Sequence, residues 1–360
     1  MSGDRRPAAP WWRADRLQAR RPHLIRRNRA KRALQALFDR LGFVEVETPA
    51  LQVSPGMEVH LQAFDTEIVD PGLGRRRLFL HTSPEFAMKK LLAGGERRIW
   101  QLTHVFRNAE RGATHHPEFS MIEWYRAGED YRALIDDCVA VLRAVAEACE
   151  TRRLTWRGVA SDPFEEWQVI GVQQAFERHA GIDLLATAPD PAEPDTGLLA
   201  EAARSIGVVP HDGDRWDDLF FRIFLERIEP RLGHPTPTVL IDYPISMAAL
   251  SRPKSDDPRL AERFELYVAG LELANAFGEL TDGAEQRRRF EADQTLRRAI
   301  HGEAHPIDED FLAAFDADRG GGLPECSGIA LGFDRLVMLA TGAAHVEDVL
   351  WAPVAAPLKS

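Results

Sequence analysis

The sequence predicts an α+β fold in which a mainly antiparallel sheet is flanked by helices. Extended runs come in neighbouring pairs, 99–106 with 118–125 and 263–268 with 271–277, as expected for antiparallel strands. Helical patterns lie between these pairs and do not alternate with single strands, as they would in a parallel sheet. With 360 residues, of which 44% are hydrophobic, the chain is long enough to bury a sizeable core.

The first predicted element is an amphipathic helix that leads into a short strand. Apolar residues from Ala30 to Leu41 recur at intervals of three and four, with Arg and Lys on the opposite face. Gly42 is placed to end this helix. Residues 43–47 then alternate with a period of two, and Pro49 is typical of a strand end.

A hairpin with a long loop is predicted next. Strand-like runs at 77–80 and 99–106 lie on either side of a helical stretch at 85–92. The polar segment 107–117 separates 99–106 from the extended run 118–125. A loop of this length between two paired strands is typical of a functional loop.

The remaining elements follow from the same periodicities. The second hairpin has the two-residue turn Ala269-Gly270. The other elements are expected as helices at 131–149, 172–180, 214–229, 283–300 and 308–315, strands at 238–243 and 328–333, and a helix that opens at Asp334.

The charge balance argues against a protein whose main task is to bind a nucleic-acid backbone. The net charge is −11, although residues 1–40 carry twelve Lys or Arg against three Asp. We interpret residues 1–21 as a basic arm that could contact an acidic macromolecule, and a solvated helix face is the simpler alternative. The three cysteines lack metal or redox spacing, and neither a signal segment nor a membrane-spanning run is found, so we expect a cytoplasmic protein.

The loop 107–117 and its flanks carry residues that suit a nucleotide. Arg107 lies at a strand end, where its permanent charge and planar donors suit a phosphate. Phe119 would return to the same neighbourhood across the hairpin and offer an aromatic face to a purine. A surface arginine and a core phenylalanine are the alternative interpretation of this pair.

Two carboxylates on the second hairpin predict a magnesium site. With the turn at Ala269-Gly270, Tyr267 faces Glu272, and Glu265 becomes a diagonal neighbour of Glu272 on the same face. Carboxylates this close repel one another unless a cation lies between them, and Mg²⁺ prefers oxygen ligands that include phosphates. Two solvated surface glutamates are the alternative.

The segment 328–335 combines small residues with an arginine. Small side chains at Gly328, Ala330 and Gly332 leave one face of the strand open to a flat ligand. Arg335 begins the next helix, where both the guanidinium and the helix dipole favour an anion.

A further group is acidic. Several carboxylates around one site would recognise a substrate that carries amines, because buried charges need partners. Local capping or pairing of these side chains is the alternative. The group consists of Glu85 after Ser83-Pro84, Glu123 with Tyr125, and Glu279 with Asn275.

Together these segments resemble the three signature motifs of class II aminoacyl-tRNA synthetases. The helix and strand that end at Pro49 resemble motif 1, residues 106–119 resemble motif 2, and residues 328–335 resemble motif 3. The resemblance implies the class II catalytic fold, with a homodimer interface built by motif 1. Within the class, the chain resembles lysyl-tRNA synthetase in segments 82–85, 116–119, 121–125 and 272–279.

One departure points to a subfamily. Lysyl-tRNA synthetases carry an anticodon-binding domain before motif 1, whereas only about 22 residues precede the motif 1 helix here. The chain therefore resembles the stand-alone elongation factor P–(R)-β-lysine ligases, which activate β-lysine with ATP and attach it to a lysine of elongation factor P. We expect residues 22–360 to form the catalytic domain. The alternatives are a truncated lysyl-tRNA synthetase that acts on tRNA and a non-catalytic regulator.

The resemblance also implies the roles of single residues. Arg107 and Arg335 would be catalytic, and Phe119 and Arg335 would enclose adenine. Mg²⁺ would be held by Glu265 and Glu272. ATP would be bound by Arg107, Asn108, His115, His116, Phe119, Glu272, Leu273, Gly332 and Arg335. The amino acid would be bound by Ser83, Pro84, Glu85, Glu123, Tyr125, Asn275, Glu279 and Ala330.

Two positions depart from the related enzymes. Motif 2 usually reads Arg-Asn-Glu, but here Ala109 follows Asn108, and Glu110 comes next. Lysyl-tRNA synthetases usually have glycine where this chain has Ala330, and the added methyl would favour a substrate whose amine lies one carbon further from the carboxylate. The resemblance also implies the partners. They are elongation factor P and a second copy of the chain, with no tRNA and no membrane.

Overall fold

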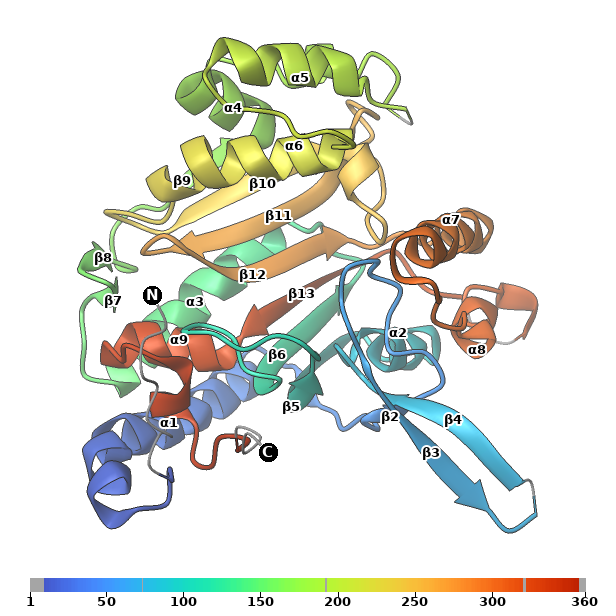
Figure 1. Ribbon diagram of the computed structural model, residues 1–360. Coiled ribbons are helices and arrows are strands. Elements are labelled where there is room, and N and C mark those ends of the chain that lie inside the picture. The colour runs from blue at the N-terminus through green and yellow to red at the C-terminus, as the bar shows by residue number, and fades with distance from the viewer. Residues whose placement is uncertain (1–9, 73, 192, 320–321, 356–360) are drawn as a thin grey trace.

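The computed structural model describes residues 10–72, 74–191, 193–319 and 322–355, and an eight-stranded sheet runs through its centre. The strands follow the order β1-β5-β6-β13-β12-β11-β10-β9 (Figure 1). Most neighbours are antiparallel, whereas β1–β5 and β9–β10 are parallel pairs, and the predicted α+β class is confirmed. The strands are β1 (Val44–Glu45), β5 (Arg98–Phe106), β6 (Glu118–Ala127), β9 (Gln168–Gly171), β10 (Thr238–Pro244), β11 (Leu260–Val268), β12 (Leu271–Gly278) and β13 (Cys326–Gly332).

Two smaller sheets and a set of helices complete the described part of the chain. The smaller sheets consist of β2 (Leu51–Gln52), β4 (Gly74–Leu80) and β3 (Phe64–Asp70), and of β7 (Leu154–Trp156) and β8 (Val159–Ser161). The α-helices are α1 (Ala14–Arg40), α2 (Glu85–Ala93), α3 (Ala133–Ala148), α4 (Val172–Ala180), α5 (Thr196–Ser205), α6 (Trp216–Ile223), α7 (Gly283–His301), α8 (Glu309–Ala313) and α9 (Phe333–Thr341).

The central strands bring together segments that are far apart in the sequence. Strand β13 pairs with β6 on one side and with β12 on the other, so that Ala330 lies opposite both Glu123 and Asn275. Strands β5 and β6 form the predicted antiparallel pair, in which Val105 lies opposite Phe119. The segments that resemble motif 2 and motif 3 therefore lie next to the second hairpin.

Helix α1 is longer than predicted. It begins at Ala14, so the expected boundary between residues 21 and 22 falls inside the helix. Arg20 is buried, and its Nη1 donates to the backbone oxygens of Glu347 and Leu350 at 2.8 Å each. Residues 1–9 of the expected basic arm lie outside the described residues, and the division into arm and catalytic domain stays a prediction.

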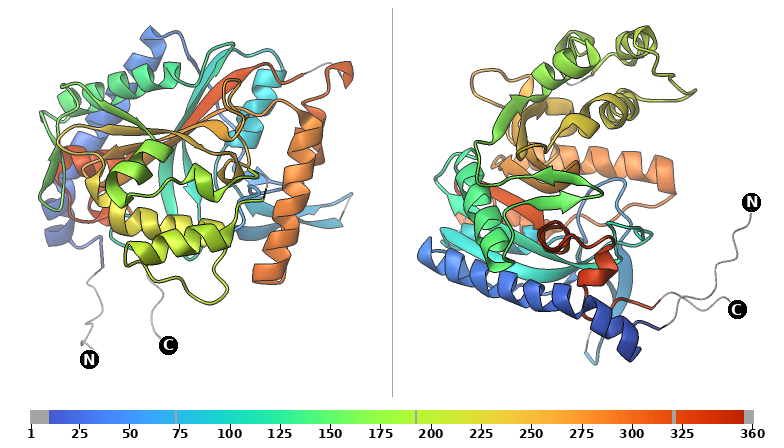
Figure 2. Two further views of the ribbon diagram at one scale, coloured as in Figure 1. Left: turned by 90° about the horizontal axis from the view of Figure 1, so that it is seen from above. Right: turned by 90° about the vertical axis from the view of Figure 1, so that its left-hand side faces the viewer.

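Apolar packing fixes helices on both sides of the sheet. Helices α1, α3 and α9 pack together over one core, in which the ring of Phe38 stacks on Trp100 with their centres 4.6 Å apart. Helices α4, α5 and α6 form a second core around Phe220 at the opposite end of the molecule (Figure 2). Among the described helices, none has both the length and the apolar character that crossing a membrane requires.

The predicted elements differ from the observed ones mainly at their ends. The strand expected at 43–47 is reduced to the two residues of β1, which pair with β5. The helix expected at 214–229 is α-helical to Ile223 and then continues as a π-helical turn, Phe224–Ile228. Pro230 follows in a 3₁₀ turn, where its missing N–H does not interrupt an α-helix.

The hairpin of β11 and β12 has the predicted turn but a different register. Ala269 and Gly270 have positive φ angles of 52° and 79°, as a type I′ turn requires. Tyr267 lies opposite Glu272 as predicted, but the ladder then shifts by one residue, so that Glu265 lies opposite Asn275. The predicted diagonal relation of Glu265 and Glu272 is therefore wrong, because a β-bulge interrupts the alternation on which it was based.

Candidate active site

A cavity of about 370 Å³ lies where the central strands meet the β5–β6 loop and the starts of α2 and α9. This volume is within the usual range for ligand pockets, about 300–1,000 Å³. Most of the predicted site residues line it: Ser83, Glu85, Arg107, His115, His116, Phe119, Glu272, Leu273, Asn275, Ala330, Gly332 and Arg335. The predicted residues outside this lining are Pro84, Asn108, Glu123, Tyr125, Glu265 and Glu279.

Arg335 is held in the cavity wall by backbone oxygens. Its Nη1 donates to Glu272 O at 2.9 Å, and its Nε donates to Thr114 O at 3.3 Å. Nη2 lies 2.7 Å from Nε2 of His115. A guanidinium can only donate, so Nε2 accepts and the His115 ring is neutral. Desolvation and the charge of Arg335 lower the pKa of His115, which agrees with this assignment.

Arg107 lies close to the second aromatic component of the site. Its Cζ is 5.3 Å from the centre of the Phe119 ring. Its buried Nε has no hydrogen-bond partner among the described residues, and Arg107 lines the cavity. An anion at this end of the cavity would therefore find a permanent cation with a free donor beside an aromatic face.

The histidine that follows His115 has a different environment. Nδ1 of His116 donates to Glu118 O at 2.6 Å, and Nε2 accepts from Val354 N at 3.2 Å. Both ring nitrogens are thus engaged with the backbone, and the buried ring fixes the C-terminal segment against the β5–β6 loop. A nucleotide contact by His116 stays a prediction.

The departure in motif 2 has a structural counterpart. Ala109 adopts a left-handed conformation with φ of 63°, and its N–H donates to Oδ1 of the exposed Asn108 at 2.8 Å. Glu110, the next residue, lines the cavity. A carboxylate therefore reaches this wall from one position further along the chain than in the usual motif.

The predicted metal ligands occupy two different depths. Glu272 lines the cavity, whereas Glu265 is buried behind it and accepts hydrogen bonds from Tyr243 and Tyr267 at 2.6 Å each and from Arg263 at 2.5 Å. Partial burial and the charge of Glu265 raise the pKa of Glu272 to about 7. The charges of the two carboxylates thus repel one another, and a magnesium ion held by both stays a prediction.

We call the part of the lining formed by Ser83, Glu85, Asn275 and Ala330 the amine half, after the substrate amines that the sequence predicts for it. Oδ1 of Asn275 accepts from Nε of Arg263 at 3.3 Å. Glu85 is the first residue of α2 and lies two positions after Ser83. Its N–H donates to Oγ of Ser83 at 3.0 Å. This wall offers a carboxylate and an amide oxygen to a ligand.

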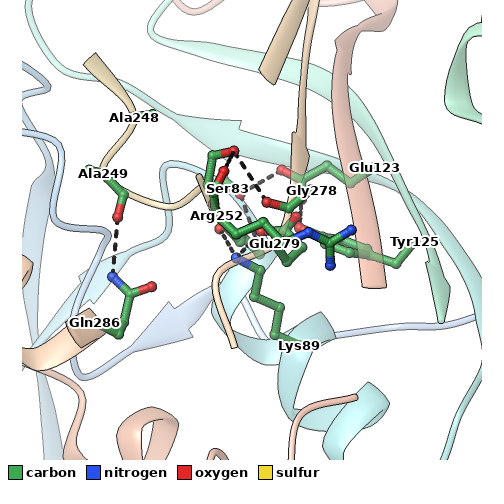
Figure 3. Close-up of polar contacts among 12 residues, drawn as sticks. Ser83, Lys89, Glu123, Tyr125, Ala248, Ala249, Arg252, Gly278, Glu279 and Gln286 are labelled. Atoms are coloured by element: carbon green, nitrogen blue, oxygen red, sulfur yellow. Dashed lines mark hydrogen bonds and ion pairs between the residues drawn. The ribbon is translucent and has the colours of Figure 1, made fainter. Parts of the chain in front are cut away.

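Behind that wall lies a buried acidic cluster, drawn in Figure 3. Glu123 accepts from Oγ of Ser83 at 2.5 Å and from the Tyr125 hydroxyl at 3.1 Å, and it is 1% exposed. Burial and the nearby Glu85 raise the pKa of Glu123 to about 8. Glu279 is fully buried, and burial raises its pKa while Lys89 opposes that shift.

A glycine makes room for this cluster. A Cβ at Gly328 would lie 2.2 Å from the Tyr125 ring and 2.5 Å from Oε1 of Glu279. Both distances are far shorter than a van der Waals contact, so any larger residue would displace these side chains. The small residues of β13 thus leave room for the side chains behind the amine half. They also provide the flat ligand surface that the sequence predicts.

Lys89 is a component of the site that the sequence analysis missed. Its Nζ lies 2.5 Å from Oε1 of Glu85. It also lies 2.6 Å from Oε2 of Glu279 (Figure 3). The sequence could have indicated part of this arrangement. Lys89 follows Glu85 by four residues in a predicted helix, and oppositely charged residues at this spacing form ion pairs. The pairing with Glu279 could not be predicted from spacing.

Other missed residues belong to neighbouring loops and strands. Arg263 lines the cavity from β11, and its Cζ lies 4.3 Å from the centre of the Tyr243 ring. Glu58 and Leu61 line it from the segment before β3. Buried Arg297 of α7 holds that segment by donating to the backbone oxygen of Leu61 at 2.8 Å. Nothing in the sequence pattern of these residues sets them apart from ordinary surface and strand positions.

Comparison with known proteins agrees with this geometry. Residues 6–355 match the family model described as tRNA synthetases class II (D, K and N). The chain is 40% identical over 328 residues to an elongation factor P–(R)-β-lysine ligase of Haemophilus ducreyi, with 91% of this chain and 92% of the relative covered. It is 40% identical over 322 residues to the ligase of the same name from Vibrio cholerae, with 88% and 91% covered. For the one from Proteus mirabilis, identity is 39% over 335 residues, with 92% and 95% covered.

Proposed function

Since this chain belongs to the class II (D, K and N) tRNA synthetase family, we propose that it activates (R)-β-lysine with ATP and transfers it to a lysine of elongation factor P. The observation that carries this proposal is one cavity that joins Arg107 and Arg335 to an acidic wall at Glu85. Two guanidinium groups suit a triphosphate, and buried carboxylates suit the amines of a diamino acid.

The proposed reaction has two steps. In the first, the carboxylate of the substrate attacks the α-phosphorus of ATP, a P–O bond forms and pyrophosphate leaves. Arg107 and Arg335 stabilise the charge that develops on the phosphoryl oxygens and on pyrophosphate. In the second, a neutral lysine amine attacks the acyl carbon, an amide forms and AMP leaves. No side chain has to act as a nucleophile, so this site contributes orientation and charge stabilisation.

The residues present are compatible with magnesium. The carboxylate of Glu272 faces the cavity, and Glu265 lies close behind it. Among the described residues, no group of three or more ligating side chains could hold a metal, so phosphate oxygens would have to complete its coordination. Bound there, Mg²⁺ would neutralise charge on the triphosphate.

Pyrophosphate exchange tests the first step directly. We expect exchange with (R)-β-lysine, and weaker exchange with α-lysine and (S)-β-lysine. The ammonium lies on another carbon in α-lysine and points to the other side of the same carbon in (S)-β-lysine, so in both it would miss Glu85. Transfer is then measured with elongation factor P and with tRNA as acceptors. Exchange with α-lysine followed by transfer to tRNA would instead identify a lysyl-tRNA synthetase, and exchange with none of the three amino acids would favour a non-catalytic regulator.

A two-fold homodimer is part of the proposal. Strand β1 is an edge strand of the large sheet, and Val44 on it is 52% exposed. Leu51 on β2 and Val53 just after it are 46% and 50% exposed. Exposed apolar side chains that follow one another along a segment are typical of an interface with a second copy. Light scattering of the wild type and of Leu51→Lys tests this, with a dimer expected for the first and a monomer for the second.

A further inference from the structure

A buried cation lies behind the amine half of the cavity. Lys89 projects from α2 and pairs with both Glu85 and Glu279, and it is 1% exposed. Figure 3 shows its contact with Glu279. Apart from this ion pair, the carboxylate of Glu279 has no hydrogen-bond partner among the described residues. Two buried carboxylates are therefore fixed by one ammonium, and each has acceptor capacity left for a ligand.

Charged and titratable groups approach Lys89 from several elements. Helix α2 contributes Glu85, the end of β12 contributes Glu279, and β6 contributes Glu123 and Tyr125. Cys326 lies nearby at the start of β13. The segment before β11 contributes Arg252, but the Nε of this arginine is already paired with Glu262 at 2.6 Å. Glu58, in the segment before β3, also interacts by charge with Glu85 and Lys89. The cluster thus has four carboxylates and, in Lys89, one cation that belongs to it alone.

This excess of carboxylates suits the chemistry of the proposed substrate. The carboxylates outnumber the ammonium of Lys89, and a diamino acid carries two ammonium groups. A buried carboxylate without a compensating cation takes up a proton instead, because its charged form is poorly solvated. The charge of Lys89 lowers the pKa of Glu123 and of Glu279 and so favours their ionised forms.

We propose that Lys89 is a positioning residue that holds Glu85 in place and keeps Glu279 ionised, so that the acidic wall can accept the ammonium groups of the substrate at neutral pH. This inference rests on the proposed function. Lys89 itself stays charged, because Glu279 and Glu85 raise its pKa by more than burial lowers it. Without the lysine, protons would occupy the carboxylates, and the substrate would have to displace them.

The pH dependence of substrate binding tests this role. The Michaelis constant for (R)-β-lysine is measured by pyrophosphate exchange between about pH 6.5 and pH 8.5 in the wild type and in Lys89→Met. We expect the constant to be about 100-fold higher in the variant at the lower pH and within about 5-fold of the wild type at the higher pH, because the carboxylates then ionise without help. The Michaelis constant for ATP should stay within about 2-fold at both.

Two further variants separate charge from packing. Lys89→Arg keeps the positive charge. The ratio of its Michaelis constant for (R)-β-lysine to that of the wild type should therefore not change with pH. Lys90→Met is the matched control, since Lys90 is the next residue on α2 but pairs with Asp308 and Asp310 outside the cavity. It should leave both Michaelis constants unchanged. If Lys89→Met fails to bind ATP, Lys89→Gln replaces it, with the same expectation.

The outcomes distinguish this inference from the function on which it rests. A defect of equal size at both pH values would show that Lys89 acts through packing alone and would overturn the inference. A pH-dependent defect in Lys89→Arg would do the same, because the charge is retained there. Wild-type protein that exchanges with none of the lysines would overturn the proposed function, and the inference with it.

Discussion

The two halves of the cavity hold their functional groups in different ways. The nucleotide half is the part of the lining around Arg107, Phe119 and Arg335, where we propose that ATP binds. There the guanidinium of Arg335 is fixed by the backbone oxygens of Glu272 and Thr114, and it is charged at any physiological pH. In the amine half, Glu123 and Glu279 are buried, and their ionisation depends on neighbouring charges. The first half is ready to bind before any ligand arrives, whereas the second depends on pH and on Lys89.

This difference explains why one half opens to the cavity and the other does not. A guanidinium retains its charge when its donors face water, so it can line an open cavity wall without a bound ligand. A carboxylate that must select an ammonium gains strength from a low dielectric, but there it needs a partner to stay ionised. Lys89 and the hydroxyls of Ser83 and Tyr125 are the partners that this fold supplies.

The largest effect is expected in the nucleotide half. Arg107→Ala and Arg335→Ala should each lower kcat/KM for pyrophosphate exchange by about 1,000-fold, because each removes a preorganised cation from the developing phosphoryl charge. Arg111→Ala is the matched control, since Arg111 lies in the same loop but outside the cavity and contacts Glu347. An effect of similar size in the control would mean that the loop acts as a whole.

The nucleotide half also rests on a buried ion pair. Arg27 of α1 pairs with Asp334, and its Nη2 donates to Oγ of Ser120 at 2.7 Å. Asp334 also accepts from Ser120 N at 2.9 Å, which links the residues beside Phe119 and Arg335. Arg27→Leu should lower the free energy of unfolding by about 3–5 kcal/mol, because it leaves a buried carboxylate unpaired.

Urea denaturation measures that loss, and an exposed pair on the same helix provides the comparison. Arg29 is 44% exposed and pairs with Glu150. Arg29→Ala should therefore cost less than about 1 kcal/mol. Equal losses in the two variants would contradict a special role for the pair at Asp334.

A smaller and pH-dependent effect is expected in the amine half. The pKa of Glu123 is raised from 4.5 to about 8, so the folded protein keeps a proton that the unfolded chain has already lost. Wild-type stability should therefore fall as the pH rises through this interval, and Glu123→Gln should remove that part of the dependence. At about pH 8.5, where Glu123 can ionise, the same variant should raise the Michaelis constant for (R)-β-lysine by about 30-fold, since a neutral amide binds an ammonium weakly.

Chemical denaturation at about pH 5.5 and pH 8.5 checks the stability part of this prediction. If the free energy of unfolding changes equally with pH in the wild type and in Glu123→Gln, Glu123 is already ionised in the folded protein. In that case the two halves would not differ in the way described.

The smallest effect is expected from one methyl group. Ala330 lines the cavity in register with both Glu123 and Asn275. Ala330→Gly should shift the preference between α-lysine and (R)-β-lysine by about 10-fold toward α-lysine, since a buried methyl is worth about 1–3 kcal/mol in discrimination. Pyrophosphate exchange with both amino acids measures this, and an unchanged ratio would leave the methyl without a role in selection.

Much of the fold could be predicted because its signals are local. Helix α4 has the predicted bounds, and the turn at Ala269-Gly270 has the predicted geometry. The pairing of β5 with β6 followed from two alternating runs around one loop. Periodicity and turn chemistry act over a few residues, so a single sequence displays them directly.

The sequence by itself predicted the candidates for the site: the cations of the two motifs and the carboxylates Glu85, Glu123 and Glu279. The tertiary structure decided which of them face the cavity, which are buried, and which neighbour holds their charge. Lys89 meets Glu279 across 190 positions of chain, and a bulge in β12 places Glu265 opposite Asn275. These relations could not be predicted because the desolvation of a charge depends on all the atoms around it, and no local pattern records them.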